Sequence, residues 1–302
     1  MKQLLLGILG VSAAIFASYF GRDAFRRRSQ FSRASWPPLL GVGFVLNFFD
    51  TLGIGSFAPT TAFYKFTNLV EDRQIPGTLN VGHCLPVMTQ AFIFIAIVDV
   101  DPLTLVLLMT AAAMGGILGA GVVSRMPVNK IRIGLGSALL LVALVWLASL
   151  VHLMPSGGSA TGLSGWRLPF AVVMTFGLGA LQTIGIGIYA PCMALVYALG
   201  MDPRAAFPVM MGAAALLQPS AGLRFIRERS YDPKASLGLT LLGVPAVLIA
   251  AYFVKSLPLT ALKWTLVAVI LLASAMMFNS ARSRPAKPAG SLRDEVVGPG
   301  RT

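Results

Sequence analysis

Two nine-residue stretches, TLGIGSFAP at 51–59 and TIGIGIYAP at 183–191, decide how this chain folds. They share Thr, Gly, Ile, Gly, Ala and Pro at matching positions, 132 residues apart. Each lies inside an unusually long apolar segment, 37–64 or 168–199. Because glycine relaxes the backbone and proline removes a hydrogen-bond donor, neither stretch can continue a regular helix. We therefore expect two broken helices at corresponding places of an internal repeat.

The composition predicts a membrane protein. The chain has 302 residues, of which 56% are hydrophobic and only 12% are charged, with a mean hydropathy of +0.78. A soluble globule of this kind would expose large apolar patches, so a soluble enzyme is nearly excluded. The net charge of +13 comes from short clusters of cations between apolar segments, as in cytoplasmic loops. The sequence has no basic face with interleaved aromatic residues, so its positive charge does not indicate nucleic-acid binding.

Apolar segments near the ~20 residues that cross a bilayer recur along the whole chain. They lie at 4–20, 37–64, 78–98, 103–123, 131–151, 168–199, 205–223, 236–254 and 260–280. If the two long segments dip into the membrane and return, Lys and Arg gather on the cytoplasmic side more completely than if both cross. This favours seven crossings and two re-entrant hairpins, with a periplasmic N-terminus and a cytoplasmic C-terminus. If both long segments cross instead, each repeat has four spans and the repeats are parallel.

The repeat divides the chain into five parts. We predict an N-terminal transmembrane helix with a basic cytoplasmic loop at 1–36, repeat 1 at 37–151, a Gly/Ser-rich linker at 152–167, repeat 2 at 168–281 and a disordered cytoplasmic tail at 282–302. Each repeat then combines one broken hairpin with three spans, an odd number that turns the second copy upside down. The predicted fold is an all-α, polytopic membrane protein with two inverted repeats, a plan typical of secondary transporters.

The broken segments are the predicted site. Irregular backbone inside a membrane must face protein or a wet cavity, and the amides of a restarted helix carry partial positive charge. Two such ends near the midplane would bind an anion with few full charges. The candidate substrate-binding residues are Thr51, Gly53, Gly55, Ser56, Asn80, Thr183, Gly185, Gly187 and Gln218. Close helix packing is the alternative reading for the glycines, and bonds between helices for the threonines and glutamines.

Two residues are candidates for a coupling proton. Asp50 is ionisable within an apolar stretch, where such groups are functional by default, although a helix cap is slightly favoured. His83 titrates near neutral pH, and a structural, hydrogen-bonded histidine is an equal alternative.

Other chemistry has little support in the sequence. Cys84 and Cys192 both lie in apolar stretches, so neither a disulfide framework nor a metal site is expected, and no cofactor is implied. The sequence contains no GxxxxGK[ST], HExxH or GxSxG motif, so we expect neither an ATP-driven motor nor an enzyme. The GxxxG pattern at 115–119 predicts helix packing and is compatible with a homodimer.

Four stretches resemble the sulfite exporter TauE/SafE family of bacterial inner-membrane permeases. They are FDTLGIGSFAPTTAFYK at 49–65, IPGTLNVG at 75–82, GGILGAGVVSRMP at 115–127 and GLGALQTIGIGIYAP at 177–191. The resemblance covers about 37–281. It implies a permease of the inner membrane that exports or imports small anions such as sulfite, sulfoacetate or other organosulfonates, with proton coupling.

The sequence thus predicts a secondary transporter that moves a small, sulfur-containing oxyanion through a site at the membrane midplane. A passive anion channel and a membrane assembly factor without a substrate are the two alternatives. A channel would not concentrate its solute against a gradient. An assembly factor would have a dry, fully packed interior where a transporter has a polar cavity.

Overall fold

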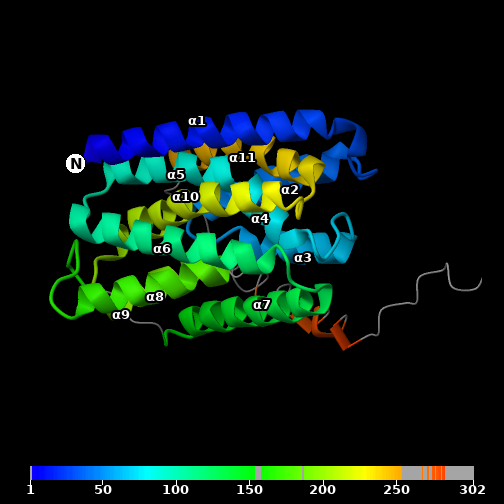
Figure 1. Ribbon diagram of the computed structural model, residues 1–302. Coiled ribbons are helices and arrows are strands. Elements are labelled where there is room, and N and C mark those ends of the chain that lie inside the picture. The colour runs from blue at the N-terminus through cyan, green and yellow to red at the C-terminus, as the bar shows by residue number, and fades with distance from the viewer. Residues whose placement is uncertain are drawn as a thin grey trace, which may run out of the picture.

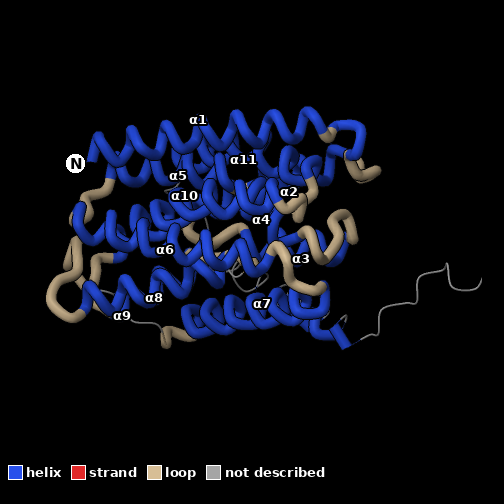
Figure 2. The backbone as a smooth tube through the Cα atoms, viewed as in Figure 1, coloured by secondary structure: helices blue, strands red, loops and turns tan. Residues whose placement is uncertain are grey.

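The computed structural model describes residues 2–153, 158–185 and 187–253, with isolated positions between 267 and 282. The predicted last span at 260–280 and the tail at 282–302 fall mostly outside these residues. The helices are α1 (Lys2–Arg26), α2 (Trp36–Thr51), α3 (Phe57–Thr67), α4 (Ile75–Gly82), α5 (Cys84–Ile97), α6 (Pro102–Val123), α7 (Val128–Leu150), α8 (Arg167–Gln182), α9 (Tyr189–Ala198), α10 (Pro203–Arg227) and α11 (Pro233–Phe253), with a short 3-10 turn, η1 (Arg28–Gln30). They lie side by side in one bundle (Figures 1 and 2).

The described chain is a multi-pass, all-helical membrane protein. Five helices are long and apolar enough to cross a bilayer, namely α1, α6, α7, α10 and α11. A sixth candidate is the pair α4 and α5, which are bent by 41° against each other. The segment predicted as one span at 78–98 is therefore two shorter helices that begin at Ile75.

Pro86 accounts for part of this bend. It has no N–H, so the carbonyl of Gly82 loses its usual partner one turn later. The hydroxyl of Thr240 on α11 donates to that carbonyl instead, at 2.8 Å. An unpaired carbonyl would be costly inside a membrane, and the neighbouring helix therefore stabilises the break.

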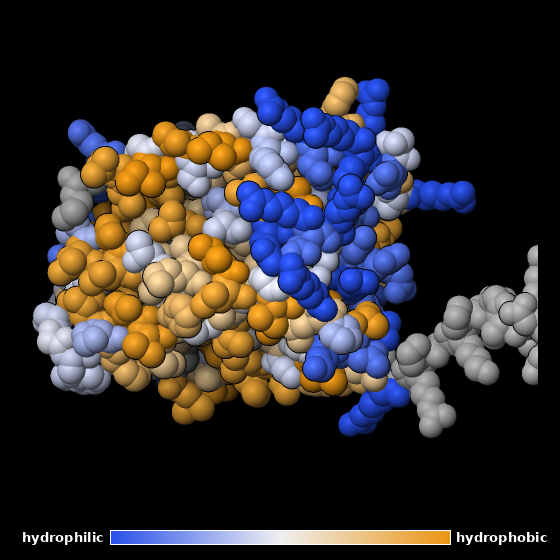
Figure 3. All heavy atoms as spheres, in the orientation of Figure 1, coloured by the Kyte–Doolittle hydropathy of each residue, from blue (hydrophilic) through white to orange (hydrophobic). Residues whose placement is uncertain are grey.

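One end of the bundle carries most of the charged side chains, the hydrophilic surface at the right of Figure 3. Here Tyr231 donates to Asp23 at the end of α1, and Lys234 donates to the carbonyl of Ala34 just before α2. Asp72 binds both Lys65, near the end of α3, and Arg132 in α7. Since α2 begins and α3 ends at this same end, the segment 36–67 enters the bundle and returns.

The opposite end of the bundle lies about 37 Å away, the length of the 25-residue α1. Lys2 pairs there with Asp99 before α6. Arg167, the first residue of α8, donates to the carbonyl of Leu199 directly after α9. The segment 167–198 therefore enters and returns from this end, and the two hairpins meet in the interior.

Two helix contacts mirror each other. α2 packs on α11, where a Cβ on Gly243 would lie 2.6 Å from Nδ2 of Asn47. α6 packs on α8, where a Cβ on Gly179 would lie 2.8 Å from Cα of Ala112. Gly179 follows Asn47 by 132 positions, and Gly243 follows Ala112 by 131. In the predicted repeats, the glycine of each contact therefore corresponds to the partner residue of the other contact.

The two glycines of the GxxxG pattern at 115–119 face a neighbouring helix of the same bundle. A Cβ on Gly119 would lie 2.6 Å from the carbonyl oxygen of Ala180 and 2.6 Å from the hydroxyl of Thr183, and one on Gly115 would press on the carbonyl of Phe176. The pattern brings α6 against α8 of the same chain, and these glycines are not available to a partner subunit.

Candidate functional site

The repeated glycines break both hairpins in the same way. Gly53 and Gly55 have φ values of +85° and +88°, and Gly185 and Gly187 have +114° and +74°. Left-handed backbone at these positions is easy only for glycine. The chain therefore leaves α2 at Thr51 and restarts in α3, and it leaves α8 and restarts in α9 by the same geometry.

The restarted helices present free amides to the interior. Ser56 and Ile188 occupy the N-cap positions of α3 and α9, and neither side chain caps its helix. Pro59 and Pro191 stand at the third position of each helix, where a missing N–H costs nothing. The amides of Phe57, Ala58, Tyr189 and Ala190 donate to no backbone carbonyl within the described residues, whereas the backbone amide of Ser56 faces the Asp50 carboxyl.

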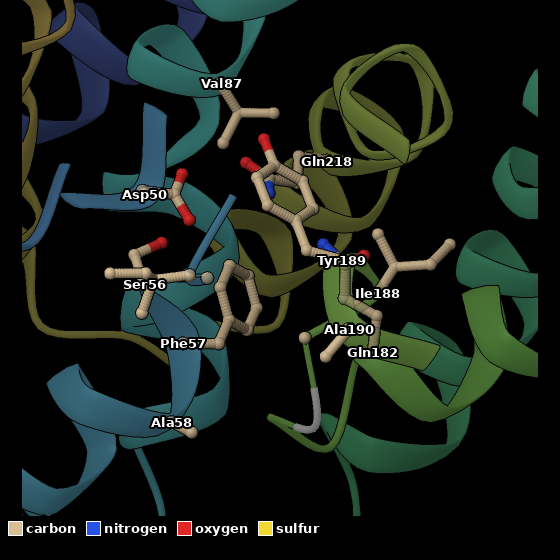
Figure 4. Close-up of a pocket in the computed structure, with 13 residues that line it drawn as sticks. Asp50, Ser56, Phe57, Ala58, Val87, Gln182, Ile188, Tyr189, Ala190 and Gln218 are labelled. Atoms are coloured by element: carbon tan, nitrogen blue, oxygen red, sulfur yellow. The ribbon is translucent and has the colours of Figure 1, made fainter. Parts of the chain in front are cut away.

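Both N-termini line one small cavity, shown in Figure 4. Its volume is about 20 Å³, room for roughly one water molecule. The lining residues come from the two breaks and the helices behind them: Asp50, Ile54, Gly55, Ser56, Phe57, Ala58, Val87, Gln182, Gly187, Ile188, Tyr189, Ala190 and Gln218. The N-termini of α3 and α9, which follow the two predicted breaks, thus lie against one cavity whose largely apolar wall includes Asp50, Ser56, Gln182 and Gln218.

A chain of hydrogen bonds crosses from one hairpin to the other. Gln90 on α5 donates through Nε2 to Oδ2 of Asp50 on α2, at 2.8 Å. The hydroxyl of Tyr189 on α9 donates to Oε1 of the same Gln90, at 2.5 Å. Gln90 stands behind the cavity wall and fixes the side chains of Asp50 and Tyr189, which both line it.

A second polar chain follows the break of the first hairpin. His83, at the bend between α4 and α5, is fully buried. Its Nδ1 lies 2.9 Å from Oδ1 of Asn47 on α2, and its Nε2 lies 3.0 Å from the hydroxyl of Thr60 on α3. The ring of Phe57 covers the imidazole, with 5.6 Å between the ring centroids. His83 therefore ties α2 and α3 to the bend of a third segment.

Three buried oxygens in the cavity wall lack any partner. They are Oγ of Ser56, Oε1 of Gln182 and Oε1 of Gln218. The hydroxyl of Ser56 points toward the Asp50 carboxyl (Figure 4) without completing a hydrogen bond. Buried polar atoms are nearly always paired, so this cluster indicates a place that water or a ligand fills.

The structure gathers some of the predicted site residues and separates others. Gly55, Ser56, Gly187 and Gln218 line the cavity, together with the coupling candidate Asp50. The remaining candidates lie outside its wall: Thr51, Gly53, Asn80, His83, Thr183 and Gly185.

The separated residues make contacts of other kinds. Thr51 and Thr183 donate to carbonyls of their own chain segments, and Asn80 donates to the carbonyl of Pro76. Gly53 faces the ring of Phe207, and Gly185 faces Leu135. None of these five residues lines the cavity.

Two important side chains were not among the predicted site residues. Tyr189 stands where the first nonamer has Phe57, so the only signal was one hydroxyl at a repeated position. For Gln90 the sequence left substrate binding and bonding between helices equally open, because its role depends on Asp50 and Tyr189 lying on either side of it.

Comparisons with models of protein families, with curated proteins and with solved structures find no match. No group of three or more His, Cys, Asp or Glu side chains suited to a metal ion occurs in the described part of the chain. Fold and site together define a helical, multi-pass membrane protein with two broken hairpins that meet at a small cavity.

Proposed function

We propose that this protein is a secondary transporter that binds a small anion between the N-termini of α3 and α9. The observation that carries the proposal is that the N-termini of α3 and α9 lie against one cavity, without a capping bond from their own N-cap side chains, and are reached by hairpins from opposite ends of the bundle. Free amides at a helix N-terminus attract negative charge without placing a full cation in the membrane.

The repeats are, in this proposal, inverted copies of one unit. The exchanged contacts of Asn47 with Gly243 and of Ala112 with Gly179 support it. So do Asp101 and Asp232, which both cap a long helix that begins with proline, one at each end of the bundle. Alternating access then follows from rocking one hairpin unit against the other around the shared site.

The anion enters only when the hairpins separate. A cavity of about 20 Å³ holds one water, which is less than the four heavy atoms of sulfite need. In this conformation the cavity is therefore too small for the substrate. A passive channel would need a wide and continuous path, and an assembly factor has no use for unpaired polar groups in its interior.

The substrate class and location follow from the sequence. The resemblance to the TauE/SafE family favours sulfite or an organosulfonate such as sulfoacetate, and the inner membrane of a bacterium. The positive-inside rule makes the basic end of the bundle cytoplasmic, so the N-terminus faces the periplasm and the C-terminus the cytoplasm.

Exchange of labelled anions by purified protein in proteoliposomes tests the proposal. We expect exchange with at least one of sulfite, sulfoacetate, taurine, sulfate and thiosulfate. Gly55→Leu and Gly187→Leu, which place a branched side chain at left-handed backbone beside the cavity, should abolish it while membrane insertion persists.

The matched control is Gly177→Leu, since a Cβ on Gly177 in α8 would meet nothing within 4 Å. Full exchange in either cavity variant, or none in the wild type with the whole panel, contradicts the proposal.

A further inference from the structure

We propose that Lys65 and Arg132 form a second oxyanion site, at the basic end of the route between the central cavity and the cytoplasm. The carboxylate of Asp72 occupies this site while the route is closed and so acts as its gate. This inference rests on the transport function proposed above and assigns the cytoplasmic gate and the residues that line the way to it.

Asp72 is bound by the two cations as a small oxyanion would be. Nζ of Lys65 donates to both carboxylate oxygens, at 3.1 and 3.0 Å, and Nε of Arg132 donates to Oδ2 at 2.7 Å. The side chains of Lys65 and Asp72 are only 8% and 12% exposed, so water weakens these bonds little. A sulfite or sulfonate group presents similar oxygens, and the same two cations can bind it when Asp72 leaves.

One face of α3 leads from the cavity to this cluster. Phe57 and Ala58, the first residues of the helix, line the cavity. Thr61 follows them one turn later and Lys65 a further turn on, at the spacing that places side chains on one helix face. All four residues are buried. The helix rises about 12 Å from Phe57 to Lys65, so two turns join the proposed central site to Asp72.

Thr61 lies where the second hairpin meets this face. A Cβ on Gly185 would lie 3.8 Å from Oγ1 of Thr61 and 2.6 Å from Cδ2 of Leu135 on α7. The hydroxyl of Thr61 therefore faces the left-handed turn of the second break. Arg132 precedes Leu135 by one turn of α7, as Lys65 follows Thr61 by one turn of α3. Both helices thus lead from this point to the cluster around Asp72.

The buried hydroxyls along α3 indicate that this side of the helix is a polar route. Those of Ser56, Thr61 and Tyr64 have no hydrogen-bond partner among the described residues. Buried polar atoms are nearly always paired, so water or a passing anion is expected to pair them in another conformation. The fold itself does not require them. At an offset of 132 residues the second hairpin has apolar residues at all three positions, namely Ile188, Met193 and Val196.

Charge explains why the gate opens for an anion and stays closed without one. Asp72 lies in the loop between α3 and α4, whereas Arg132 belongs to α7, so their bond holds the first hairpin against α7. If Asp72 left alone, Lys65 and Arg132 would remain largely buried without a counter-charge, which is costly. An anion that arrives along α3 replaces the carboxylate and removes this cost. The empty carrier therefore keeps its cytoplasmic route closed.

Labelling of an introduced cysteine tests the gate. In a Cys84→Ala, Cys192→Ala background, Thr61→Cys should react with 2-sulfonatoethyl methanethiosulfonate, a small anionic thiol reagent, in inside-out vesicles, which expose the basic end. Asp72→Asn removes the internal carboxylate and should raise the rate about tenfold, the factor expected for loss of one charged hydrogen bond. Met193→Cys, at the corresponding position of α9, is the matched control, and its rate should not rise.

A second gate variant keeps this test independent of how well Asp72→Asn folds. Arg132→Gln cuts the same link from the side of α7 and should also raise the labelling rate of Thr61→Cys. Equal rates with and without the gate substitutions, or an equal rise for Met193→Cys, overturn the gate.

Thermal unfolding of the purified protein in sulfate and in chloride, at equal ionic strength, tests the anion site. Asp72→Asn should gain more from sulfate than the wild type does, because sulfate then binds the two cations. Adding Lys65→Gln should abolish this extra gain. The same sulfate effect in all three proteins would show a general action of the salt and overturns the site. Neither experiment measures transport, so their failure leaves the proposed function standing, and failure of anion exchange in the wild type is seen separately.

Discussion

Gly43 on α2 lies directly against Gly238 on α11, with backbone touching backbone where the first hairpin meets a helix of the other repeat. A Cβ on Gly43 would press on the carbonyl oxygen of Gly238 and lie 2.9 Å from Cα of Leu239. The hairpin is therefore held by close approach of two main chains rather than by interdigitating side chains, as in many membrane helix contacts.

Gly43→Ala should destabilise the protein by about 1–3 kcal/mol, because rigid backbone cannot move away from the added methyl group. Thermal unfolding in detergent measures this as a lower midpoint. Gly41→Ala, two residues earlier in the same helix and with nothing within 4 Å of its Cβ, is the control and should be neutral or slightly stabilising. Equal effects of both substitutions would contradict the packing argument.

Gly119→Ile should weaken the folded monomer and leave its mass in detergent unchanged. The glycine faces Ala180 and Thr183 of the same chain, so a large side chain there separates α6 from α8. Light scattering together with thermal unfolding distinguishes the two effects, and Gly177→Ile is the matched control on α8. A change of oligomeric mass without loss of stability would instead place this GxxxG pattern at a subunit interface.

Thr240→Val should cost about 1–3 kcal/mol, because the carbonyl of Gly82 then stays buried without a partner. Thr240→Ser keeps the hydroxyl and should cost less. In a Pro86→Ala background, residue 86 regains its N–H and can pair with Gly82, so the penalty of Thr240→Val should shrink. An undiminished penalty in the double variant would show that Thr240 acts by packing alone.

Tyr231 should make the folded protein less stable as the pH becomes alkaline. Its burial and its hydrogen bond to Asp23 raise the pKa of the phenol in the folded protein. Above the ordinary tyrosine pKa of about 10, the unfolded chain loses this proton while the folded chain keeps it, so stability falls as pH rises. Unfolding midpoints measured from pH 9 upward should therefore fall more steeply for the wild type than for Tyr231→Phe. Parallel slopes would exclude this contribution.

The sequence by itself determined the class of fold and the position of its two breaks. The nonamers at 51–59 and 183–191 contain glycines whose positive φ values no other residue adopts easily, so the breaks are local properties of the chain. The apolar segments likewise follow from local composition, because a bilayer requires a minimum apolar length wherever a helix crosses it. The bend at His83 was missed, since Pro86 alone does not say whether a neighbouring helix will stabilise a broken turn.

Only the tertiary structure decided which polar residues meet. Thr183 lies in a repeated nonamer, as Ser56 does, yet it bonds to backbone outside the cavity wall. Asn80, on α4, likewise bonds to backbone there. Gln90 contacts Asp50 and Tyr189 across 40 and 99 positions of the chain. Such partners depend on how the two hairpins approach each other, and helix periodicity carries no information about that approach.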